Sequence, residues 1–196
     1  LCNEDALYLY DSNTQKVTFI QNEIKERITN IVQIDSTHFF IGTDIGIHYA
    51  ELENNVLTLS PCDQLDTLKV QINELYYHKP SRKVFIGTFQ RGIFVYDLNK
   101  HKLMHIPSGL MDVSINCIRA YTDNEILIAT DGAGIYKMNA ATYESVPYIV
   151  ADYNRHNSMN VNTINDIYID SEQRIWIANY PIGITVRDNR YADYQW

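Results

Sequence analysis

The chain has 196 residues, of which 45% are hydrophobic and 20% charged, so it can bury a sizeable core. Its net charge of −8 argues against nucleic-acid binding, which needs clustered Lys and Arg. No apolar run reaches the roughly 20 residues of a membrane span, so we expect membrane attachment only through other parts of a longer protein. Three cysteines make no disulfide framework. We expect Cys117 to be a buried free thiol and leave a Cys2–Cys62 bridge open.

Two short strands are predicted at the amino terminus, over residues 6–11 and 17–20. From residue 28 onward a longer pattern occurs four times. Each copy has an opening apolar strand, a second apolar strand ending at Gly or Ala, a turn containing Gly, and a third strand ending at an acid or amide. The amino-terminal pair matches the second half of this pattern.

The repeat positions define the expected strands. The opening strands begin at Ile28, Ile72, Ile115 and Ile164. The small anchor residues that end the second strands are Gly42, Gly87, Ala129 and Ala178, spaced 45, 42 and 49 residues apart. The turns contain Gly46, Gly92, Gly134 and Gly183, and we expect each to need a backbone torsion that only Gly adopts cheaply. Outer strands are expected over residues 56–59, 103–106, 143–148 and 191–196.

Four short antiparallel strands in roughly 40–50 residues form the blade of a β-propeller. A helical solenoid has repeats of similar length, but these segments are too short and too β-branched for helices. We therefore predict an all-β protein, a propeller fragment of about four and a half blades. The expected units are a half blade over 1–22 and blades over 23–68, 69–110, 111–156 and 157–196. Since the chain starts within a blade, we expect a piece of a longer ectodomain, or an arc closed by another copy.

The last repeat is the most diagnostic. It has an Asn-rich lead-in over residues 157–170, then Arg174-Ile175-Trp176-Ile177-Ala178, then Gly183-Ile184. It resembles the two-component regulator propeller repeat, although Gln173 stands where that family prefers Gly and Asn179 where it has Thr. The resemblance implies the periplasmic sensor region of a hybrid two-component system, with histidine kinase and response regulator functions elsewhere in the polypeptide. It also implies an oligosaccharide ligand.

The turns between the second and third strands are expected to open on the ligand-binding face, together with the inter-blade segments. Aromatic rings stack on sugars, and Arg, Gln and Asn offer forked hydrogen bonds. The alternative is that these residues are solvated loop tips. The predicted ligand-binding residues are Phe89, Gln90, Arg91, Asp131, Asn179 and Tyr180.

Other recurring residues are interpreted as structural. Thr29, Asn73, Asn116 and Asn165 either line the central channel or, as we favour, bond backbone groups near the blade crossing. Phe40, Phe85, Leu127 and Trp176 are predicted inter-blade core. We expect turn formers at Asp11, Glu51, Asp97, Asn139 and Asp188.

No catalytic motif appears, and we expect neither enzymatic activity nor a cofactor in this segment. His101 and His105 lack further ligands for a metal site. The expected partners are an oligosaccharide and either a second copy or a neighbouring propeller domain. Two alternatives stay open: a protein-interaction or dimerisation scaffold without a small ligand, and a propeller lyase or glycoside hydrolase, whose carboxylates converge without a sequence motif.

Overall fold

The computed structural model describes residues 2–3, 6–152, 154, 158–159, 161–188 and 190. These residues form five antiparallel sheets, each built from strands consecutive in sequence. The first sheet contains β1 (Cys2–Asn3), β2 (Ala6–Asp11) and β3 (Lys16–Ile20). The second contains β4 (Ile28–Gln33), β5 (His38–Thr43), β6 (Ile47–Glu53) and β7 (Val56–Ser60). The third contains β8 (Ile72–His78), β9 (Lys83–Thr88), β10 (Ile93–Asp97) and β11 (Lys102–His105).

The fourth sheet contains β12 (Ile115–Ala120), β13 (Glu125–Thr130), β14 (Ile135–Asn139) and β15 (Ser145–Ile149). The fifth contains β16 (Ile164–Ile169), β17 (Ile175–Asn179) and β18 (Gly183–Arg187), while the outer strand predicted over 191–196 lies outside the described residues. Two short helical segments, α1 (Asp63–Asp66) and η1 (Lys79–Ser81), were not predicted. Leu65 of α1 is 1% exposed and packs in the cluster that contains Phe40.

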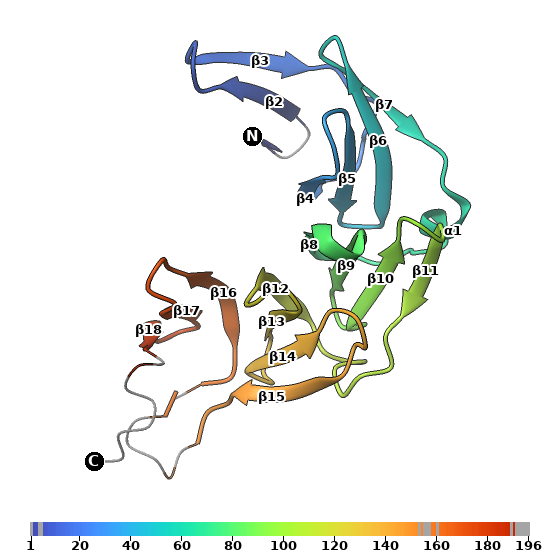
Figure 1. Ribbon diagram of the computed structural model, residues 1–196. Helices are drawn as coiled ribbons and strands as arrows, with labels where there is room; N and C mark the ends of the chain where they lie inside the picture. Colours follow the sequence, from blue (N-terminus) through green and yellow to red (C-terminus); the bar gives the residue numbers. More distant parts are fainter. Residues whose placement is uncertain are drawn as a thin grey trace.

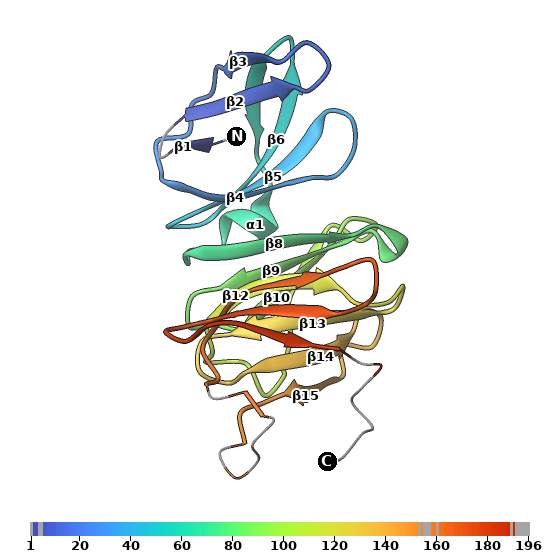
Figure 2. The same ribbon diagram turned by 90° about the vertical axis from the view of Figure 1, so that its left-hand side faces the viewer.

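The sheets are arranged as an arc (Figure 1). The first strands β4, β8 and β12 lie toward its inside, and the last strands β7, β11 and β15 lie on its outside. Seen from the open side of the arc, β1–β3 lie at the top and β15 at the bottom, and the last strands, coloured red, lie in front of β12–β14 (Figure 2). The predicted all-β propeller class is confirmed, and each opening strand begins at the predicted isoleucine.

The anchor glycines are small because the next blade packs against them. A Cβ on Gly42 would lie 2.7 Å from Cγ2 of Ile72, and a Cβ on Gly87 would lie 2.7 Å from Cγ2 of Ile115. Each of these isoleucines opens the inner strand of the following blade. The repeat therefore needs a small residue at this position so that adjacent sheets approach closely enough to bury their apolar faces.

The prediction for the turn glycines is correct at three positions and wrong at Gly46. Gly92, Gly134 and Gly183 have φ values of +66°, +80° and +113°, which disfavour any side chain. Gly46 does not adopt this conformation. A Cβ there would lie 3.2 Å from the carbonyl oxygen of Leu68, so the role of Gly46 is to let another backbone segment approach.

Four of the five predicted turn formers are confirmed. Side-chain oxygens of Asp11, Asp97, Asn139 and Asp188 accept backbone N–H bonds from the residue two positions later, at 2.8 to 3.0 Å. Glu51 was predicted wrongly. It lies within β6 opposite Thr58, and this hairpin turns instead at Asn54 and Asn55, whose φ values of +50° and +64° suit a tight two-residue turn.

The prediction for Trp176 is also wrong. Phe40, Phe85 and Leu127 are fully buried, because the sheet of the next blade covers each of them, but Trp176 is 37% exposed. In the described part of the chain, no sheet follows β16–β18 to cover it. Its indole Nε1 instead donates to Oδ2 of Asp170 at 2.9 Å, which ties the second strand of this blade to the preceding hairpin.

The described cysteines are free thiols. Cys117 is 1% exposed, as predicted, and Cys62 lies beside Tyr96, with 3.4 Å between Sγ and the phenol oxygen. The side chain of Cys2 lies outside the described residues, so its pairing stays a prediction. Among the helices that the structure describes, none has the length and apolar character needed to cross a membrane.

Candidate ligand-binding site

Every inner strand of the four later sheets carries a bulge at its second residue. The pairing register shifts between Ile28 and Asn30, and the shift recurs at the same place in β8, β12 and β16. The extra residue left unpaired is one of the polar set Thr29, Asn73, Asn116 and Asn165. A bulge re-aims a side chain without ending the strand, so the repeat presents a polar group at this level of each blade.

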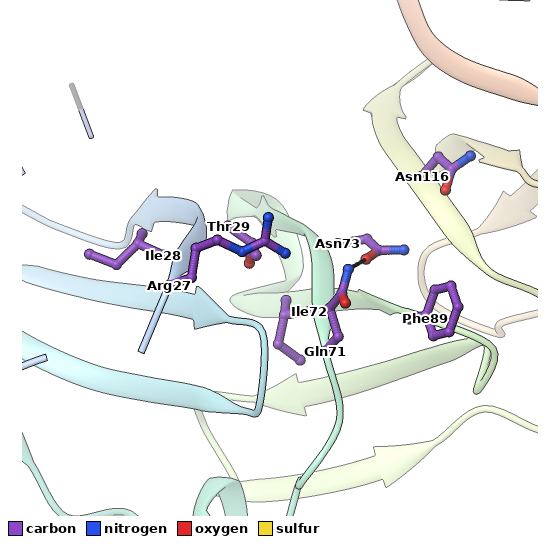
Figure 3. A pocket seen from close by; sticks show the side chains of 8 residues that line it. All are labelled: Arg27, Ile28, Thr29, Gln71, Ile72, Asn73, Phe89 and Asn116. Atoms are coloured by element: carbon purple, nitrogen blue, oxygen red, sulfur yellow. Dashed lines mark hydrogen bonds between the residues drawn. The ribbon is translucent and has the colours of Figure 1, made fainter. Parts of the chain in front are cut away.

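Three of these bulges line an open pocket of about 550 Å³. Its walls come from three successive blades, as Figure 3 shows. The lining residues are Arg27, Ile28, Thr29, Gln71, Ile72, Asn73, Phe89 and Asn116. A site of this size and composition has room for a small polar ligand in contact with several blades at once.

A recurring backbone hydrogen bond positions the rim of this pocket. The N–H group of the residue after each second strand donates to the carbonyl of the residue just before the opening strand. The four pairs are Asp44 to Arg27, Phe89 to Gln71, Asp131 to Ser114 and Tyr180 to Thr163, at 3.0 to 3.1 Å. Arg27 and Gln71 therefore occupy equivalent repeat positions, and Phe89 faces the same space from the turn between β9 and β10.

Hydrogen bonding in the pocket is only partly satisfied within the protein. Nε2 of Gln71 donates to Oδ1 of Asn73 at 2.9 Å, drawn as a dashed line in Figure 3. Nδ2 of Asn116 donates to the backbone carbonyl of Ile164 at 2.9 Å, which is the favoured structural role. Oγ1 of Thr29 is buried without a partner in the described residues. Asn116 therefore has a structural role, whereas Nδ2 of Asn73 has no acceptor among the described residues.

A second polar row follows the bulges on the same inner strands. Nδ2 of Asn30 donates to Glu74 at 2.9 Å, and Nη1 of Arg119 donates to the other oxygen of that carboxylate at 2.5 Å. Nη2 of Arg119 donates to Oδ1 of Asp166 at 2.9 Å, and the thiol of Cys117 donates to the same oxygen at 3.0 Å. This inner-strand row, Asn30, Glu74, Cys117, Arg119 and Asp166, links four blades.

Burial perturbs two groups of this row. Glu74 is 9% exposed, and its burial raises the pKa of its carboxyl even though Arg119 opposes the shift. Burial, reinforced by the hydrogen bond to Asp166, raises the pKa of the Cys117 thiol far above its usual range. Because the thiolate is the nucleophilic form, a buried thiol with a raised pKa is unreactive. We therefore assign the inner-strand row a structural role.

The six residues predicted to bind ligand are not gathered in one place. Phe89 lines the pocket and is 45% exposed, whereas the other five are absent from its lining. Gln90 and Arg91 follow Phe89 in the same exposed turn, and Asp131 and Tyr180 are exposed at the corresponding turns of later blades. Asn179 is 6% exposed, and its Nδ2 donates to Oγ1 of Thr185, so it supports the turn.

Sequence reasoning missed Gln71 and the whole inner-strand row. A signal for the row was present, because a polar bulge residue is followed directly by a second polar residue at Asn30, Glu74 and Asp166. Arg27 was not among the residues predicted to bind ligand. In the part of the chain that the structure describes, no group of three or more His, Cys, Asp or Glu residues is placed to hold a metal ion. His105 Nε2 lies 3.0 Å from the carbonyl oxygen of Arg91.

The arc of repeating antiparallel sheets defines a β-propeller segment. Residues 158–180 match the family model of the two-component regulator propeller, and the chain carries a repeat of this family, as the sequence predicted. The matched stretch includes Asp170 and Trp176, which are joined by the hydrogen bond described above. A search of curated proteins finds no match to this chain.

Solved structures of two proteins from B. thetaiotaomicron share the fold. One is the extracellular domain of BT4673, described as a one-component and also as a hybrid two-component system, with a TM-score of 0.73 and 22% identity over 93% of this chain. The other is the extracellular domain of the hybrid two-component system BT3049, with a TM-score of 0.70 and 19% identity over 95% of this chain. This chain spans 25% of the length of each.

A third similar structure is the computationally designed protein Ika8, with a TM-score of 0.61 and 12% identity. The match covers 94% of this chain and 53% of the designed one. At these identities the three likenesses establish the fold of the chain.

Proposed function

We propose that this chain is a ligand-sensing propeller segment of an extracytoplasmic, periplasmic receptor of the hybrid two-component type. Its ligand is an oligosaccharide bound in the pocket at the inner-strand bulges. The observation that carries the proposal is the pocket itself, which joins polar groups of three blades to the exposed ring of Phe89. The family repeat and the fold shared with extracellular receptor domains support the setting.

The proposed mechanism is binding rather than turnover. A ligand that contacts Thr29, Asn73 and Asn116 at once bridges three inner strands, so it favours one relative packing of the blades. The ligand shifts the equilibrium between the two signalling states of the receptor only by the difference between its affinities for them. Kinase chemistry belongs to other parts of a full-length receptor.

The test is a thermal-shift screen of oligosaccharides, followed by calorimetric titration of the ligands found. A ligand at a hundredfold excess over its Kd raises the free energy of unfolding by about 2.7 kcal/mol. This corresponds to a rise of roughly 5–10 °C in Tm for a chain of this size. Phe89→Ala should weaken binding about tenfold through lost stacking and leave the Tm of the free protein nearly unchanged. Tyr180→Ala is the matched control, because Tyr180 is exposed but lies outside the pocket. If both variants lose affinity equally, or if neither loses affinity, the ligand does not bind in this pocket.

A protein-interaction scaffold is the second candidate, and the two ends of the arc favour it. Apolar residues are exposed on the first sheet, including Val17 (58%) and Phe19 (56%), and on the last, including Tyr168 (65%) and Ile184 (72%). Exposed apolar faces of this kind mark association surfaces. A concentration series in light scattering tests this candidate, and a monomer at all concentrations would argue against self-association. A lyase or hydrolase is the least favoured alternative, and product formation from a bound oligosaccharide would support it.

A further inference from the structure

We infer that the pocket selects an anionic ligand, and that the guanidinium of Arg27 binds a carboxylate or sulfate group on the sugar. This inference rests on the proposed function, because it specifies the ligand of the same pocket. It starts from the charge of the lining: Arg27 is the one charged residue among the eight, and none of the eight is acidic. The net charge of the chain is −8, so a pocket whose one charged lining residue is a cation differs from the chain as a whole.

Arg27 is available to a ligand. Its side chain makes no hydrogen bond or ion pair with any residue that the structure describes. Asp44 is bound to the backbone carbonyl of Arg27 through its own N–H group at 3.1 Å, but its carboxylate makes no ion pair with the guanidinium. Figure 3 shows the guanidinium of Arg27 extending toward Asn73, into the space between the blades.

The repeat itself makes Arg27 distinctive. The equivalent positions in the next three blades hold Gln71, Ser114 and Thr163, all neutral. Each of the four residues gives its backbone carbonyl to the same structural hydrogen bond, which does not depend on the side chain. The side chains of Gln71 and Ser114 make further contacts within the protein, to Asn73 and to the N–H group of Gln90, whereas the side chain of Arg27 makes none with the described residues. A long cation at this position in one blade is therefore explained better by the pocket than by the architecture of the repeat.

The neighbouring groups complete a site for acceptor oxygens. Nδ2 of Asn73, which lies in the same lining as Arg27, is a donor without an acceptor in the described residues. Thr29 also belongs to this lining, and its hydroxyl oxygen is buried without a partner in the described residues. The two acidic groups of the inner-strand row, Glu74 and Asp166, are both bonded to the guanidinium of Arg119, which offsets part of their charge. A guanidinium binds a carboxylate or sulfate through two parallel hydrogen bonds, and flanking amides bind the adjoining hydroxyls.

The experiment compares probes that differ only in charge. Calorimetry is performed with trigalacturonic acid and its methyl ester, and with a sulfated galactotriose and its unsulfated parent. The proteins are the wild type, Arg27→Gln and, as the matched control, Lys25→Gln, since Lys25 is an exposed cation two residues away and outside the pocket. Each titration is repeated at two salt concentrations, because a charge pair weakens with ionic strength.

The expected result is that at least one acidic probe binds the wild type tenfold or more tightly than its neutral counterpart. Arg27→Gln should remove this preference and flatten the salt dependence, while Lys25→Gln should keep both. The two acidic probes distinguish a carboxylate from a sulfate. Equal binding of charged and neutral probes, or a preference that survives Arg27→Gln, would overturn the inference.

The failures of the two proposals are distinguishable. If no acidic probe binds but a neutral oligosaccharide from the screen binds in a manner that depends on Phe89, the anionic ligand is wrong and the proposed function stands. If no oligosaccharide of either kind binds, both are overturned.

Discussion

Arg119 on β12 joins the carboxylate of Glu74 on β8 across a blade boundary, with 2.5 Å between Nη1 and Oε1. The same guanidinium reaches forward to Asp166 on β16 at 2.9 Å, so one side chain connects three inner strands. Glu74 is 12% exposed at its side chain and Arg119 38%, so the acid is deeply buried while the base remains partly hydrated. This asymmetry decides how the pair responds to mutation and to pH.

Replacing Arg119 with Met is expected to destabilise the protein by about 2 kcal/mol at pH 7.5. The loss leaves Glu74 buried without its counter-charge, and we place the value below the 3–5 kcal/mol of a fully buried pair because Arg119 is partly exposed. Urea unfolding of the variant measures it. Lys100→Met is the control, because Lys100 is 73% exposed at 3.9 Å from Asp97 and should cost less than about 0.5 kcal/mol. Similar losses in both variants would contradict a special role for the buried pair.

The stability conferred by Glu74 is expected to fall as pH rises. Burial raises the pKa of this carboxyl, so the folded protein binds the proton more tightly than the unfolded chain, whose pKa is about 4.3. Below that value the contribution is fully present, and it is lost as pH rises through the folded-state pKa. Unfolding free energies of wild type and Glu74→Gln between pH 4 and 8 measure the effect. As pH rises, the wild type should lose stability relative to Glu74→Gln. A difference in unfolding free energy that stays constant with pH would refute the raised pKa.

Gly87→Ala is expected to destabilise the array by about 1–3 kcal/mol. The new Cβ would lie 2.7 Å from Cγ2 of Ile115, so adjacent blades must separate or Ile115 must leave its rotamer. Gly109→Ala is the matched control, because a Cβ at Gly109 meets nothing within 4 Å. Thermal unfolding of both variants measures the effect, and only Gly87→Ala should lower the Tm. An unchanged Tm for Gly87→Ala would show that the blade interface can relax.

Gln173→Gly is expected to stabilise the last blade by up to about 1 kcal/mol. Gln173 has φ +61°, a conformation that costs a side chain more than it costs Gly, although Gly has more freedom in the unfolded chain. This geometry gives a physical reason for the glycine that the resembling family prefers here. Glu172→Gly, one residue earlier and without positive φ, should be destabilising and serves as the control. A lower Tm for Gln173→Gly would refute the strain argument.

The sequence alone determined the strand order and the repeat. Opening strands start at Ile28, Ile72, Ile115 and Ile164 as predicted, because short apolar runs, turn residues and the spacing of small anchors are local signals. The same local logic identified Asp11, Asp97, Asn139 and Asp188 as turn formers. The prediction of a turn at Glu51 was wrong, because this hairpin turns at Asn54 and Asn55 instead.

Contacts between blades were decided by the tertiary structure. Trp176 matches Phe40 in the repeat pattern, but its burial depends on whether a neighbouring sheet covers it, which a local pattern does not contain. The pocket also depends on the tertiary structure. One extra residue per inner strand re-aims Thr29, Asn73 and Asn116 toward a common space, and only the curvature of the arc brings Arg27 and Phe89 to its rim. Side chains separated by more than 40 residues meet because each blade buries its apolar face against the next.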